Sequence, residues 1–132
     1  MNAPTATDLL LTAAEPTRLR ILNCLAAAPL FVSDLQDVLD LPQPTVSRHL
    51  QVLRRAGLVR DTPIAQFVLY RLRRDAGAPG RLLSAILDAL VQDDPALRAE
   101  RERAAQRSRS HTHTRVQEPR TMRALPRARR PT

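Results

Sequence analysis

The sequence predicts a mainly α-helical fold that carries one small β-hairpin. Two observations lead to this fold class. Apolar residues recur at helical spacing as far as Gly57, in segments bounded by proline, serine, aspartate and glycine. Beyond Gly57 the period changes, because two short runs rich in β-branched and aromatic residues precede the next helical pattern near Arg81.

Two helices are expected at the start of the chain. The first is short, is capped by Asp8 and carries the leucines of Leu9–Leu11. The second opens at Glu15-Pro16-Thr17, where a proline in the first turn costs little because its missing N–H has no partner there. Pro29 ends this helix.

A second pair of helices follows, joined by a tight turn at residues 40–43. Ser33 is expected to cap a helix over residues 34–39. Pro44 then starts a longer helix that ends at Gly57, a residue suited to the position after a helix. Two helices joined in this way fit a helix-turn-helix.

The β-rich runs after the fourth helix predict a two-stranded hairpin. Leu58–Arg60 and Phe67–Leu72 are the expected strands, and Asp61–Gln66 connects them with Pro63 near the tip. A hairpin directly after a helix-turn-helix gives the winged-helix arrangement. A further helix is expected over about residues 81–92.

The net charge lies in about the last quarter of the chain. The sequence has 21 arginines, no lysine and 13 acidic residues. Residues 1–97 contain ten arginines and ten acidic residues, whereas residues 98–132 contain eleven arginines and three glutamates and so carry the whole +8. We therefore divide the chain into a winged-helix and dimerisation domain over 1–95 and an arginine-rich, largely disordered tail over 96–132, with a helix restarting at Pro95 and reaching about Ala105.

The fourth predicted helix has two distinct faces. At 100° per residue, Val46, Leu50 and Leu53 share one side and form the buried face. The opposite side carries hydroxyl, arginine and glutamine side chains, which suit hydrogen bonding to base edges and phosphates. The candidate DNA-binding residues on and beside this helix are Gln43, Thr45, Ser47, Arg48, His49, Gln51 and Arg55.

Two segments resemble a known family. EPTRLRIL at residues 15–22 and PQPTVSRHLQVLRRAGLV at residues 42–59 are similar to signature runs of the ArsR/SmtB family of bacterial repressors. The resemblance implies a homodimeric winged-helix repressor that binds a palindromic operator in double-stranded DNA and dimerises through its terminal helices. The candidate interface residues are Leu9, Leu10, Leu82, Ile86 and Leu90.

The metal sites of that family have no counterpart here. Metal-sensing members carry a Cys-x-Cys pair where this chain has Phe31-Val32-Ser33, and the helix over residues 81–92 contains no histidine. Cys24 is the single cysteine and is expected to act as a small buried apolar residue. We expect no metal and no cofactor, and the residues do not indicate an inducer.

Other interpretations remain open at this stage. His49 is either a half-buried side chain bonded to a neighbour or a phosphate contact, and the tail is either a solvated extension or a source of non-specific attraction to DNA. A nucleoid-associated or RNA-binding architectural protein acting through the tail is the alternative function, and a protein-interaction module is a third. No catalytic constellation, membrane span or signal peptide is evident, so we expect a cytoplasmic protein that is not an enzyme.

Overall fold

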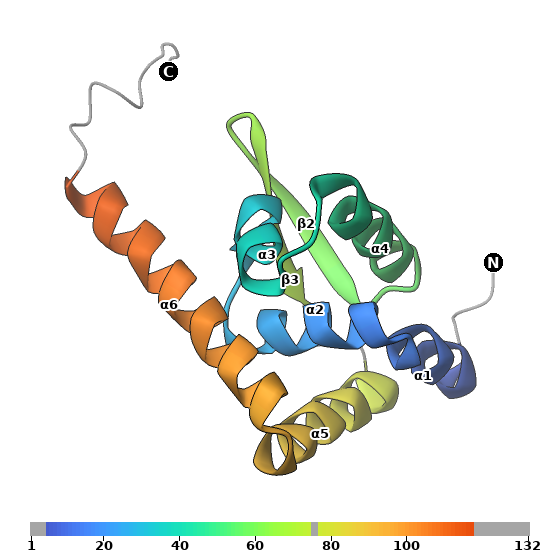
Figure 1. The fold of residues 1–132 in the computed structure, drawn as a ribbon. Helices are drawn as coiled ribbons and strands as arrows, with labels where there is room; N and C mark the ends of the chain where they lie inside the picture. Colours follow the sequence, from blue (N-terminus) through green and yellow to red (C-terminus); the bar gives the residue numbers. More distant parts are fainter. Residues whose placement is uncertain (1–4, 75–76, 118–132) are drawn as a thin grey trace.

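Six helices and a three-stranded antiparallel sheet make up the described part of the chain (Figure 1). The computed structural model describes residues 5–74 and 77–117, with side chains as far as His111. It confirms the predicted winged helix-turn-helix fold. In chain order the elements are α1 (Ala6–Ala14), α2 (Pro16–Ala27), β1 (Leu30–Phe31), α3 (Val32–Leu39), α4 (Gln43–Arg55), β2 (Val59–Ile64), β3 (Phe67–Leu72), α5 (Gly77–Asp93) and α6 (Pro95–Gln117).

The first two helices begin with side-chain caps. The Asp8 backbone N–H donates to Thr5 Oγ1 and the Thr5 N–H donates to Asp8 Oδ2, both at 3.1 Å. Thr5 is therefore the N-cap of α1, and the prediction that Asp8 holds this position was wrong, because Asp8 is the third residue of a capping box. α2 begins at Pro16 as predicted, and Glu15 Oε1 accepts from the Arg18 N–H at 3.0 Å.

The helix-turn-helix consists of α3 and α4. α3 starts earlier than predicted, because Asp34 reaches back and its Oδ2 accepts from the Phe31 N–H at 2.8 Å. Ser33 is consequently a first-turn residue and not the cap. Asp40 ends α3 in the left-handed conformation with φ 56°, and α4 follows from Gln43. Gly57 ends that helix with φ +80°, as predicted.

The hairpin is longer than the sequence indicated. β2 pairs with β3 from Val59↔Leu72 to Ile64↔Phe67, which leaves only residues 65 and 66 in the turn. The prediction that Asp61–Gln66 forms the connection was therefore wrong. Pro63 is tolerated inside β2 because β2 is an edge strand of the β1-β3-β2 sheet. β1 was not predicted, since two residues are too few to show the alternation of apolar and polar side chains that marks a strand.

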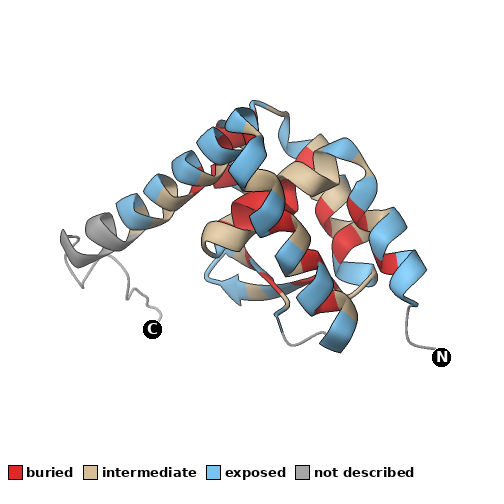
Figure 2. Ribbon diagram, turned by 90° about the horizontal axis from the view of Figure 1, so that it is seen from below, coloured by how far each residue is buried: buried red, intermediate tan, exposed pale blue. Residues whose placement is uncertain are grey.

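The core lies between α2, α3, α4 and the sheet, where buried residues line the inner faces (Figure 2). The predicted buried face of α4, made of Val46, Leu50 and Leu53, has no exposed surface. Ile21, Leu22 and Leu35 are also fully buried. α4 thus has a fixed position, with one face anchored in the core.

α6 extends further than predicted and packs along α2 and α3 (Figure 1). We expected this helix to reach only about Ala105 within a largely disordered tail, whereas it continues to Gln117. Polar contacts hold it: Arg20 bonds Glu100 at 2.6 Å, and Asn23 Nδ2 donates to the Leu97 carbonyl at 2.8 Å. The predicted boundary near residue 95 therefore does not coincide with the end of the packed structure. The predicted disorder of residues 118–132 lies outside the described residues.

Candidate DNA-binding surface

α4 presents a polar face opposite its anchored side. Val46, Leu50 and Leu53 are each 0% exposed, so the rotation of the helix is fixed by its packing. Arg48 and Gln43 are exposed, and Thr45 and Ser47 are partly exposed beside them. The structure therefore places four of the seven candidate side chains, Gln43, Thr45, Ser47 and Arg48, together on the first two turns of one helix.

Two of these side chains are already hydrogen-bonded to each other. Gln43 Nε2 donates to Ser47 Oγ at 2.7 Å, one helical turn further along. The contact orders the amide of Gln43, which still has a free N–H and a carbonyl oxygen for a base edge. The first turn of α4 is thus pre-organised for hydrogen bonding.

The second half of α4 carries further arginine and glutamine side chains. Arg54 donates to Gln51 Oε1 through Nη2 at 2.8 Å and Nε at 3.3 Å. Arg55 is exposed in the last turn. At 1.5 Å per residue, Arg55 lies about 18 Å from Gln43 along the helix axis. Gln51 and Arg55 therefore belong to the opposite end of the polar surface from Gln43.

His49 lies apart from the other candidates. Its side chain is 15% exposed, and Nε2 lies 3.8 Å from Glu15 Oε2 at the start of α2. Burial opposes ionisation of Glu15, but backbone N–H groups of Arg18 and Thr17 together with His49 lower the pKa of this carboxyl. His49 thus contacts a neighbouring helix and has little surface left for a phosphate.

A groove beside the first turn of α4 was not predicted. It has a volume of about 400 Å³, and α3, α4 and the hairpin turn all contribute to it. Gln43 and Ser47 line it together with Gln66 and Phe67 of the hairpin, and Phe67 is 57% exposed. The tip of the wing therefore lies next to the first turn of α4. Gln66 was predicted to lie near the tip of the hairpin, but its proximity to α4 could not be predicted from the sequence.

Known proteins are similar in sequence to this chain. A family model described as "Helix-turn-helix domain" matches residues 13–62. The chain is 42% identical over 78 residues to the biofilm growth-associated repressor of Agrobacterium fabrum, covering 59% of this chain and 65% of the relative. It is 39% identical over 86 residues to the HTH-type transcriptional repressor SmtB of Mycobacterium tuberculosis, covering 65% and 60%.

A solved structure extends the likeness to three dimensions. Reduced HlyU from Vibrio cholerae matches with 34% identity and a TM-score of 0.57, over 66% of this chain and 86% of that one. The chain belongs to the ArsR/SmtB family of helix-turn-helix transcriptional regulators. Family members regulate transcription by binding DNA, in agreement with the prediction that the chain is not an enzyme.

Compared with ArsR/SmtB metal sensors, the start of α3 has a different chemistry. Phe31, the first residue of the Phe31-Val32-Ser33 segment, packs edge-on against two rings. The ring centroids are 6.0 Å apart for Phe67 and 5.5 Å apart for His111. Within the described residues, no group of three or more histidine, cysteine or acidic side chains could hold a metal ion. The start of α3 therefore has aromatic packing around Phe31.

The predicted dimer surface of this ArsR/SmtB chain lies on α1 and α5. A groove of about 350 Å³ runs between them, lined by apolar residues that include Leu10, Ile86 and Leu90. Leu82 is 47% exposed and Leu11 is 68% exposed. Leu9 is only 6% exposed and packs in the core of its own chain, so it offers little area to a partner.

None of the described helices is long and apolar enough to span a membrane.

Proposed function

We propose that the protein is a homodimeric transcriptional repressor that reads a palindromic operator in double-stranded DNA with α4. The observation that carries the proposal is the polar first half of α4, where Gln43, Thr45, Ser47 and Arg48 project from a helix whose other face is anchored. An arginine or glutamine at this position can bond two atoms of one base edge in the major groove. The names of two relatives, both repressors, support the direction of regulation.

The homodimer rests on the apolar groove between α1 and α5. Two copies related by a two-fold axis would cover Leu10, Leu82, Ile86 and Leu90 and place their α4 helices in successive turns of the major groove, which is why the operator would be palindromic. Gln51 and Arg55 would then contact the flanks of each half-site. His49 would orient α4 through Glu15.

The alternative of an architectural protein acting through the arginine-rich segment has less support. Arg101 and Arg107 are engaged in ion pairs with Asp88 and Asp34, and Arg103 donates to the Val38 carbonyl at 3.1 Å. These three arginines stabilise α6 on the body of the molecule. They contribute less to a non-specific contact with nucleic acid than their number suggests.

Selection of bound sequences from a pool of random double-stranded DNA tests the proposal. We expect an enriched palindrome with half-sites about one helical turn apart. The DNA upstream of the coding region of the protein is the first natural fragment to footprint. Binding without enrichment of any sequence would favour the architectural alternative, and an absence of binding would favour a protein-interaction module.

A further inference from the structure

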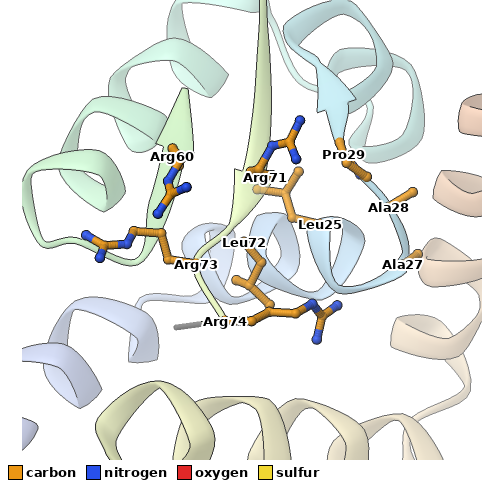
Figure 3. Close-up of a pocket in the computed structure, with 9 residues that line it drawn as sticks. All are labelled: Leu25, Ala27, Ala28, Pro29, Arg60, Arg71, Leu72, Arg73 and Arg74. Atoms are coloured by element: carbon orange, nitrogen blue, oxygen red, sulfur yellow. The ribbon is translucent and has the colours of Figure 1, made fainter. Parts of the chain in front are cut away.

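An open pocket with four arginines lies at the base of the hairpin, opposite its tip. Its volume is about 380 Å³, in the range of small-molecule sites. Arg60 comes from β2, Arg71 from β3, and Arg73 and Arg74 from the segment that follows β3 (Figure 3). None of the nine described residues that line this pocket is acidic.

The strand pairing concentrates positive charge here. Arg60 and Arg71 are directly opposite each other across β2 and β3. Arg74 is held at the end of α2, where its Nη2 donates to the Ala26 carbonyl at 2.8 Å. A guanidinium has five N–H donors, so this bond leaves most of them for a ligand. Figure 3 shows Arg71 and Arg74 turned toward the side of Ala27 and Pro29.

The pocket is separate from the proposed DNA-binding surface. The groove beside the first turn of α4 contains Gln66 and Phe67 at the hairpin turn, whereas the arginine pocket contains Leu72 at the other end of β3. Along β2, Arg60 and Ile64 are separated by roughly 13 Å at 3.3 Å per residue. A ligand in this pocket would therefore not occupy the site of the operator.

We propose that this pocket binds a small organic polyanion that carries phosphate or carboxylate groups. The planar fork of an arginine bonds both groups through paired N–H donors. Pro29 and the alanines at the end of α2 form an apolar wall for the rest of the ligand. The anion would join the end of α2 to the base of the hairpin.

Calorimetric titration of the full chain with sodium pyrophosphate, and separately with sodium citrate, tests the site at constant ionic strength. We expect saturable binding of at least one probe, weakened about tenfold or more in Arg71→Gln. Arg48→Gln removes the same charge from α4 and serves as the matched control, with unchanged affinity for the probe. Arg71→Gln should in turn keep the DNA preference that Arg48→Gln alters, so that failure of either proposal is recognised separately.

Any one of three results would overturn the anion site. The first is that neither probe shows saturable binding, and the second is that both variants lose affinity for the probe equally. The third is that Arg71→Gln binds the probe as tightly as the unaltered chain does. If neither probe binds while Arg71→Gln lowers affinity for double-stranded DNA at all sequences and flattens its salt dependence, the cluster is a contact to the DNA backbone.

Discussion

At the scale of single residues, we expect sequence recognition by α4 to depend most directly on Arg48. It is exposed on the first half of the helix, opposite the buried Val46 and Leu50. We expect Arg48→Ala to weaken operator binding by about 1–3 kcal/mol and to relax the preference at one base pair, if its fork bonds guanine. Competition binding with operators altered one base pair at a time measures this. Equal weakening on all sequences would instead make Arg48 a phosphate contact.

Cys24 is expected to make the stability of the folded protein depend on pH in the alkaline range. Burial raises the pKa of its thiol from 9.0 to about 12. Between these values the unfolded chain releases the thiol proton while the folded chain retains it, so the free energy of unfolding falls as pH rises, by at most about 1.4 kcal/mol per pH unit. Burial also raises the pKa of Tyr70, so the thiol contribution must be isolated by comparison with a variant.

Urea unfolding of the unaltered chain and Cys24→Ala from pH 8 upward isolates that contribution. The variant is less stable at neutral pH because a cavity replaces the sulfur. The stability difference between the two proteins should shrink above pH 9. Two stability curves that stay parallel would show that the thiol titrates normally in the folded chain.

At the scale of elements, the contact between α3 and α6 centres on one buried carboxylate. Asp34 is 0% exposed, bonds the Phe31 N–H, and is paired with Arg107 at 3.1 Å and with His111. We expect Asp34→Ala to cost about 3 kcal/mol, because it leaves these donors without their acceptor. Thermal or urea unfolding followed by circular dichroism provides the measurement.

Asp37 supplies the matched control for that experiment. It lies on the same helix and pairs with the same Arg107 at 3.1 Å, but its side chain is 63% exposed. Asp37→Ala should cost less than about 1 kcal/mol, since solvent screens the pair. Similar losses in both variants would mean that burial of Asp34 adds nothing to the contact.

The limits of some helices could be predicted from the sequence, and those of others could not. α2 and α4 were predicted closely, because proline at the start and Pro29 or Gly57 after the end mark their limits, and because the inward faces keep helical spacing. The cap of α3 was missed because Ser33 and Asp34 are both common near helix starts. Asp34 bonds the Phe31 N–H from the third position of the helix, and its other carboxylate oxygen accepts from Arg107 of α6, more than seventy positions away.

The length of α6 could not be predicted for a related reason. Its sequence lacks a clear apolar stripe, and it is held by Asn23, Arg20 and Asp34 from other helices. In the candidate site, the spacing predicted which α4 side chains are exposed. It could not show that His49 turns to Glu15 or that Phe67 lies beside Gln43, since both depend on how separate elements pack.

At the scale of the whole molecule, dimerisation is expected to depend on α5. Ile86 and Leu90 line the groove with α1, and Leu82 extends the apolar surface by one turn. Ile86→Asp should convert the dimer to a monomer, because a carboxylate would lose its hydration in the interface. Gln92→Asp, an exposed change on another side of the same helix, should stay dimeric. Light scattering at micromolar concentration distinguishes them, and a dimeric Ile86→Asp would contradict the proposed interface.

The charge of the C-terminal segment is expected to act on affinity and not on sequence preference. Residues 112–132 contain six arginines and one glutamate. A chain that ends at His111 keeps the partners of Asp34 and should select the same operator. Its slope of log affinity against log salt should become shallower by up to about five units if these arginines pair with phosphates. An unchanged slope would show that the segment does not touch DNA.

The geometry of the sheet has a consequence for how the molecules behave in a crowded solution. β1 forms one edge and has only two residues, and β2 forms the other edge and contains Pro63, which has no N–H to donate. A strand from another molecule that tried to extend the sheet at β2 would meet that gap and the exposed charges of Arg60 and Asp61. The wing can therefore project from the body without serving as a template for aggregation, and contacts between copies are left to the helices.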